Sequence, residues 1–150
     1  MKHLFFLVFL LLLTNCFGYK PIFSSSNINY NIKDVKNLTQ DKVTNYIVRK
    51  LKSYKSDDKK EDISLEISSS SNERVLSKDT KGDPIIFEMN IIVDVKLSLQ
   101  GRNDKYFQFK ENFSYNNRSN KFDLKLYKDN LQKNIAEKIT KNIILKIRSL

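Results

Sequence analysis

The clearest pattern in this chain is a strict alternation of apolar and polar residues in its second half. Apolar side chains occupy every second position from Phe87 to Leu99, and most positions between them are polar. Gly101-Arg102-Asn103-Asp104 follows as a turn-forming sequence, and the alternation resumes over residues 107–115. These segments predict two long antiparallel strands with one buried face and one solvated face.

Shorter patterns complete the first half of the chain. Residues 28–32 alternate and predict a short strand. Apolar residues at helical spacing predict an amphipathic helix over residues 40–54, for which Thr39 is the expected N-cap. A period of two returns over residues 63–67, and a run of serines, 68–71, weakens it. A second strand is therefore expected to begin at Ile63.

The C-terminal segment carries an apolar residue every three to four positions, from Leu124 to Leu150. This spacing predicts a helix over residues 124–148, about 37 Å long at about 1.5 Å per residue. A sheet with one apolar face needs helices to cover it. The predicted fold class is therefore α+β: a two-layer sandwich in which a four-stranded, mainly antiparallel sheet carries two helices on one face, in the order β-α-β-β-β-α.

The N-terminus has the pattern of an export signal. Lys2 precedes an unbroken apolar run, residues 4–13, which is shorter than the roughly 18 residues that span a bilayer. The run ends just before Cys16, the only cysteine of the chain, as in bacterial lipoprotein signals whose cysteine is acylated. Asn15 departs from the small residue usual before that cysteine. An ordinary secretory signal, with Cys16 removed or left as a free thiol, remains the alternative.

This interpretation divides the chain into three parts. Residues 1–15 are expected to be a lipoprotein signal peptide, residues 16–26 a lipidated tether containing Gly18 and Pro21, and residues 27–150 a single domain. Cys16 is the expected lipid anchor.

The residue types left after the signal limit the chemistry. The single histidine, His3, lies in the signal, so the mature chain would have no histidine and no free thiol. Catalytic triads, cysteine nucleophiles and most transition-metal sites are thereby excluded, and we expect no metal, no cofactor and no enzymatic activity.

The formal net charge of +10 favours phosphate-rich partners, although an abundance of Lys, Asn and Ile also raises charge without any ligand. Export argues against nucleic acid. The aromatic residues Phe107, Phe109 and Phe113 could pass for a base-stacking platform, but their in-phase spacing predicts core positions.

Several segments taken together resemble a known family. Cys16 is followed by Phe-Gly-Tyr-Lys-Pro, which is similar, with Phe17 inserted, to the Cys-Gly-aromatic-x-Pro start of alphaproteobacterial members of the LptE family of lipopolysaccharide-assembly lipoproteins. The other matching segments are the long strand 87–95, the turn 101–104, residues 113–116, the helix start 128–130 and the chain end 147–150.

The resemblance implies a role that composition does not reveal. It implies a non-catalytic lipoprotein anchored at the periplasmic face of the outer membrane, inside an LptD-like β-barrel, where it assists lipopolysaccharide assembly and transport. Phe17 stands where an inner-membrane retention signal would place Asp, which is consistent with this location. Lys81 and Lys128 are the candidate contacts for lipopolysaccharide phosphates.

Two alternatives belong to other classes. One is a different periplasmic lipoprotein, such as an auxiliary subunit of an ABC-type lipid transporter. The other is an exported hydrolase that uses only carboxylates, which would need two of them roughly 5–10 Å apart across a cleft. Asp94 is the carboxylate with the most apolar neighbours, but the alternation places it on the solvated face.

Overall fold

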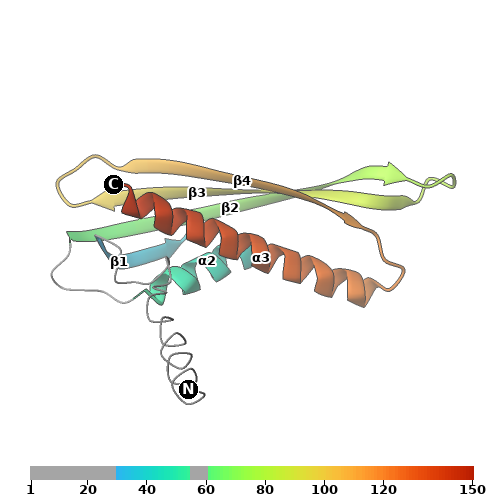
Figure 1. The fold of residues 1–150 in the computed structure, drawn as a ribbon, viewed down its shortest axis with the longest axis horizontal. Helices are drawn as coiled ribbons and strands as arrows, with labels where there is room; N and C mark the ends of the chain where they lie inside the picture. The colour runs from blue at the N-terminus through green and yellow to red at the C-terminus, as the bar shows by residue number, and fades with distance from the viewer. Residues whose placement is uncertain (1–29, 55–60) are drawn as a thin grey trace, which may run out of the picture.

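The computed structural model describes residues 30–54 and 61–150, which form one sheet with two helices on the same face (Figure 1). The four strands lie in the order β1-β2-β3-β4; β1 pairs with β2 in parallel, and the other two pairs are antiparallel. The predicted α+β architecture is confirmed. In chain order the elements are β1 (Tyr30–Asn37), α2 (Lys42–Lys52), β2 (Glu61–Lys78), β3 (Pro84–Leu99), β4 (Lys105–Asn116) and α3 (Lys121–Arg148).

The core lies between the sheet and the helices. The odd-numbered apolar residues of β3 from Met89 to Leu99 are buried against the helices, as the alternation predicts, whereas Phe87 is half-buried. Phe107, Phe109 and Phe113 of β4 are half-buried and pack against this core, so the in-phase spacing places them on the correct face although they are not fully buried. The fully buried side chains include Ile47, Leu51, Ile63, Leu65, Ile67, Ile91, Leu97, Ile139, Ile143, Ile144 and Ile147.

The opposite face of the sheet is polar. Ion pairs cross it from strand to strand, joining Lys36 to Glu66, Glu66 to Lys96 and Lys96 to Asp104. Asp94 is exposed on this face and accepts a hydrogen bond of 2.7 Å from the amide of Gln108. Asp94 is therefore a solvated carboxylate, as expected.

Helix α3 is buried unevenly along its length. Its fully buried residues all lie between Ala136 and Ile147, whereas Leu124, Tyr127 and Leu131 are only half-buried. In Figure 1 the end of α3 runs close to the strands and its start lies further from them. The first half of α3 therefore leaves room between itself and the sheet.

The prediction of Thr39 as the N-cap of the first helix is wrong. Asp41 caps α2, accepting hydrogen bonds from the N–H groups of Val43 and Thr44. The side chain of Asn37 explains why the helix starts two residues later. Its oxygen accepts hydrogen bonds from the N–H groups of Thr39 and of the next residue, and so folds the segment before α2 into a turn.

Other details of the elements also differ from the prediction. β1 begins at Tyr30 and continues to Asn37, with a register shift after Ile32. The serines 68–71 do not interrupt β2, because backbone pairing with β3 continues through them. α3 begins at Lys121, three residues earlier than predicted, because Asn120 caps it.

The predicted signal, tether and anchor (1–15, 16–26 and Cys16) lie outside the described residues. Within residues 30–54 and 61–150, no helix combines the length and the apolar character needed to cross a membrane.

Candidate functional site: a lysine-lined groove

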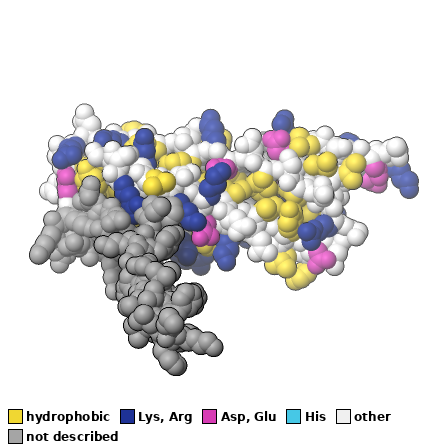
Figure 2. All heavy atoms as spheres, in the orientation of Figure 1, with side chains coloured by type: hydrophobic (Ala, Val, Ile, Leu, Met, Phe, Trp, Pro, Cys, Tyr) yellow, Lys and Arg dark blue, Asp and Glu magenta, His cyan; other side chains and the backbone are white. Residues whose placement is uncertain are grey.

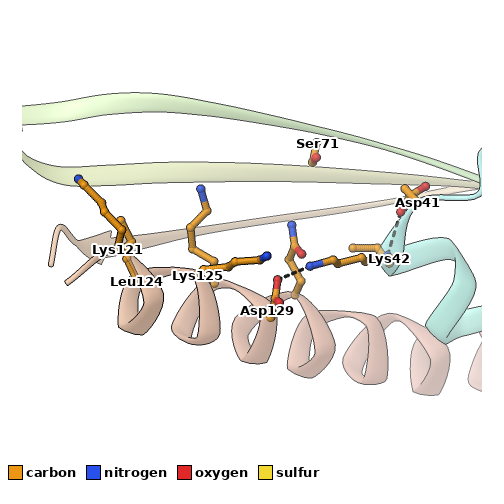
Figure 3. A pocket seen from close by; sticks show the side chains of 10 residues that line it. Asp41, Lys42, Ser71, Lys121, Leu124, Lys125 and Asp129 are labelled. Atoms are coloured by element: carbon orange, nitrogen blue, oxygen red, sulfur yellow. Dashed lines mark hydrogen bonds and ion pairs between the residues drawn. The ribbon is translucent and has the colours of Figure 1, made fainter.

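One concave feature among the described residues is a groove of about 420 Å³, which we call the lysine groove (Figure 3). It lies between the start of α2, the first half of α3 and the middle of β2. Its lining residues are Asp41, Lys42, Val43, Ser71, Lys121, Leu124, Lys125, Lys128, Asp129 and Gln132.

The helix periods explain why lysines gather here. Residues three and four apart on a helix share a face, so Lys121, Lys125 and Lys128 follow one another along one side of α3. Figure 3 shows Lys121 and Lys125 rising from α3 toward the strands. Lys42 is the first residue of α2 and reaches the groove from the other side.

Two of these four lysines are neutralised by carboxylates. The Lys42 ammonium lies 2.6 Å from the Asp129 carboxylate, and that of Lys128 lies 2.5 Å from the Glu73 carboxylate. Within the described part of the chain, Lys121 and Lys125 form no such pair. The ammonium groups of Lys121 and Lys125 are therefore not compensated by an ion pair. The lining, which also includes the carboxylate of Asp41, is net positive and favours an anionic ligand.

A cluster on three elements holds Lys128 in place. Glu73 of β2 also accepts a short hydrogen bond from the Tyr115 hydroxyl, and the Lys128 ammonium lies 5.6 Å from the centre of the Tyr115 ring. Burial acts to raise the pKa of Glu73, but the hydrogen bonds from Lys128 and Tyr115 lower it below its usual value. Burial and the bond to Glu73 both raise the pKa of Tyr115. Glu73 is therefore a charged acceptor that fixes the position of Lys128.

Asp41 forms a second polar cluster at the edge of the groove. Burial acts to raise its pKa, but the surrounding donors outweigh this effect and lower the pKa to about 2. These donors are the N–H groups of Val43 and Thr44 and the hydroxyls of Thr39, Thr44 and Ser69. Because Ser69 belongs to β2, Asp41 joins the start of α2 to the sheet, and its role is structural.

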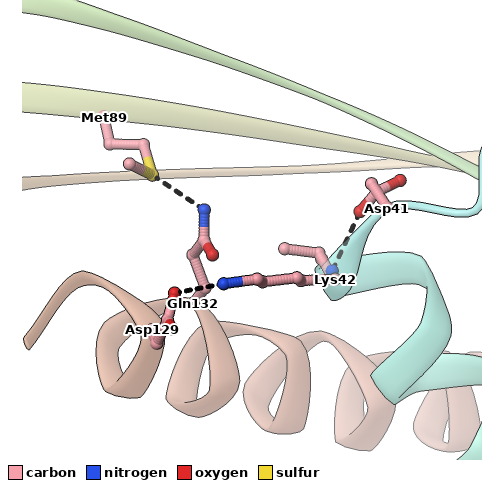
Figure 4. A network of polar contacts seen from close by, with 6 residues as sticks. Asp41, Lys42, Met89, Asp129 and Gln132 are labelled. Atoms are coloured by element: carbon pink, nitrogen blue, oxygen red, sulfur yellow. Dashed lines mark hydrogen bonds and ion pairs between the residues drawn. The ribbon is translucent and has the colours of Figure 1, made fainter. Parts of the chain in front are cut away.

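A second hollow of about 540 Å³ lies between α2 and α3, and Lys42, Asp129 and Gln132 line both hollows. The Lys42–Asp129 pair bridges the two helices here, as Figure 4 shows. Beside the pair, the Gln132 amide lies 3.6 Å from the Met89 sulfur of β3. This polar contact marks where α3 begins to approach the sheet.

The structure separates the two lysines that the resemblance singled out. Lys128 lines the groove, whereas Lys81 lies in the turn between β2 and β3, where its side chain is exposed. Glu73, the partner of Lys128, is five strand residues, or about 17 Å, from the end of β2 at Lys78. Lys81 and Lys128 therefore do not form one binding site.

Sequence reasoning did not identify Lys42, Lys121 and Lys125 as site residues. The helical spacing of Lys121, Lys125 and Lys128 was a usable signal. It was uninformative alone because lysines also occupy the exposed side of α3 elsewhere. On the face shown in Figure 2, basic side chains are spread among acidic ones, so the net charge does not gather there in one patch.

The described residues offer no metal centre, since no three His, Cys, Asp or Glu side chains lie close enough to share an ion. The chemistry that the groove does offer is charge recognition by ammonium groups.

Comparison with known proteins places the fold. No family model and no curated protein matches the sequence. Solved structures that share the fold include rare lipoprotein B from Shewanella oneidensis, with a TM-score of 0.51 and 14% identity, covering 73% of this chain and 92% of that one. They also include a minor lipoprotein from Acinetobacter baumannii, with a TM-score of 0.56 and 10% identity, covering 77% and 89%. The chain therefore has an α+β fold that occurs in lipoproteins.

Proposed function

We propose that the protein is a lipid-anchored lipoprotein of the LptE type. In this proposal it sits at the periplasmic face of the outer membrane, in complex with an LptD-like β-barrel, and assists lipopolysaccharide assembly and its transport to the outer leaflet. It binds and positions other molecules and catalyses no reaction.

The fold carries this proposal. The same arrangement of strands and helices occurs in rare lipoprotein B and in the minor lipoprotein, and it extends over about nine-tenths of each of those chains. Such coverage means that the likeness concerns a whole domain and not a common fragment.

Two features of this chain support the proposal independently of the fold. The N-terminal sequence ends its apolar run at the only cysteine, Cys16, as a lipoprotein signal does. The lysine groove offers the uncompensated charge of Lys121 and Lys125 to phosphate groups such as those of lipopolysaccharide.

Depletion of the protein tests the role in cells. We expect surface lipopolysaccharide to fall, because transport to the outer leaflet would stall. Surface labelling with a lipopolysaccharide-specific antibody measures this directly. Unchanged surface lipopolysaccharide, with a defect confined to phospholipid distribution, would favour an auxiliary subunit of a lipid transporter instead.

The two lysine positions give a prediction for direct binding. K128E is expected to weaken binding of purified lipopolysaccharide about tenfold, since it replaces the partner of Glu73 with a second carboxylate and so adds negative charge beside Lys121 and Lys125. K81E is expected to weaken it less, because Lys81 lies outside the groove, with its side chain exposed in the turn between β2 and β3. Fluorescence titration with labelled lipopolysaccharide measures both constants.

The control is K110E, the same charge change at an exposed position of β4. It should leave lipopolysaccharide binding unchanged, and all three variants should still assemble with the barrel. If K128E binds as tightly as the original protein, Lys128 is an ordinary surface lysine whose role is to pair with Glu73.

A further inference from the structure

In the described part of the chain, β2 has a strand on only one side over its second half. β1 pairs with β2 as far as Asn37, opposite Ile67, and the chain then turns away into α2. From Ser68 to Lys78, β2 pairs with β3 alone. The position that β1 would occupy if it continued is therefore open.

The backbone groups along this edge can be assigned from two hydrogen bonds. The Ile67 carbonyl accepts from the N–H of Leu38 at 2.9 Å, and the N–H of Ser69 donates to the Thr39 hydroxyl at 3.1 Å. Along an antiparallel pair, successive residues point their N–H and carbonyl groups alternately toward the partner strand and away from it. Odd-numbered residues of β2 therefore direct these groups away from β3. The next such residues, Ser71 and Glu73, offer their N–H and carbonyl groups to an added strand.

This edge lacks the features that usually prevent strand addition. Residues 68–72 are four serines and an asparagine, without charge or proline. The ladder stays regular as far as Val75, after which its register shifts. From Ser71 to Val75 the edge is regular, and its two charged side chains, Glu73 and Arg74, are paired with Lys128 and Glu88. Such an edge can accept another extended chain by main-chain hydrogen bonding.

The lysine groove lies on the helix side of the same edge. Ser71 lines the groove together with Lys121 and Lys125, and Figure 3 shows these lysines below the strand that carries Ser71. Side chains of an added strand would alternate between the groove and the opposite face. Acidic side chains at every second position would therefore meet the two uncompensated ammonium groups.

We propose that the edge of β2 from Ser71 to Val75 binds an extended acidic segment of a partner protein by strand addition, with alternate carboxylates directed at Lys121 and Lys125. The chain's own tether fits this site poorly, since residues 16–26 contain a lysine and no Asp or Glu. The inference rests on the open edge of β2 and on the positive charge of the neighbouring groove. It does not depend on the proposed role in lipopolysaccharide assembly.

A synthetic peptide tests the proposal. The probe is acetyl-Thr-Glu-Val-Glu-Val-Glu-Thr-amide with a fluorescent label, titrated with the full chain and followed by anisotropy. We expect saturable binding that weakens about tenfold in K125E, because that variant reverses a groove charge. A peptide with Lys in place of each Glu should not bind.

Backbone recognition is tested separately with S71P. Proline removes an N–H that faces away from β3, a position at which an edge strand tolerates it, so the variant should fold while the added strand loses a donor. We expect S71P to weaken peptide binding about tenfold and S71A to leave it unchanged. Circular dichroism confirms that both variants are folded.

Three outcomes would overturn the proposal. One is a dissociation constant for S71P equal to that of S71A. Another is equal binding of a probe whose amides facing the edge are N-methylated. The third is full displacement of the peptide by inorganic phosphate with no effect of S71P, since the lysines would then act only as an anion site.

Discussion

I139A is expected to lower the free energy of unfolding by about 2–5 kcal/mol, the usual loss when a buried isoleucine is truncated. Ile139 is completely buried on α3, within the part of the helix that packs against the sheet. Truncation leaves a cavity there that neighbouring side chains fill only in part. Urea unfolding of the purified protein measures the change, which should appear as a lower midpoint with an unchanged slope.

L145A is the matched control on the same helix. Leu145 retains 44% of its exposure, so L145A should lower the free energy of unfolding by well under half as much as I139A does. Equal losses from the two variants would contradict the burial pattern of α3 and, with it, the way in which this helix covers the sheet.

D41A is expected to lower the free energy of unfolding by about 2 kcal/mol at pH 7, and by progressively less in acid. The variant removes the N-cap of α2 and leaves the hydroxyls of Thr44 and Ser69 without their shared acceptor. D41N should lose less, because asparagine retains a capping oxygen.

The pH dependence follows from the pKa of Asp41. That pKa is about 2 in the folded protein, against an ordinary value of 3.8. The stabilisation by Asp41 is complete when the pH is above the pKa of Asp41 in the unfolded chain. It is lost as the pH falls through the pKa of Asp41 in the folded protein. The difference between the original protein and D41A should therefore be constant from pH 7 to about 5 and narrow below about 4. A constant difference down to pH 3 would contradict this account.

The order of elements could be predicted because each has a clear period. The alternation in β3 and the three-to-four spacing in α3 each need one apolar face directed at a common core, and the fold satisfies both. The serines 68–71 were harder to interpret, because side-chain polarity says nothing about backbone pairing with β3.

The lysine groove could not be predicted, because it depends on how α2 and the first half of α3 are placed relative to β2 in the folded chain. Lys42 and Lys125 are 83 positions apart and share a groove only because the first half of α3 leaves room beside the sheet. The cap of α2 was missed for a similar reason. Asp41 accepts a hydrogen bond from the hydroxyl of Ser69, which is distant in sequence and close only in the folded chain.

Affinity capture of the tagged protein from detergent-solubilised membranes tests the central claim most directly. A lipoprotein of the LptE type should recover a large outer-membrane β-barrel protein, together with lipopolysaccharide. The mass of the captured protein should also correspond to cleavage before Cys16 and acylation of that cysteine. Recovery of inner-membrane ATPase subunits, without a β-barrel protein, would contradict the proposed function.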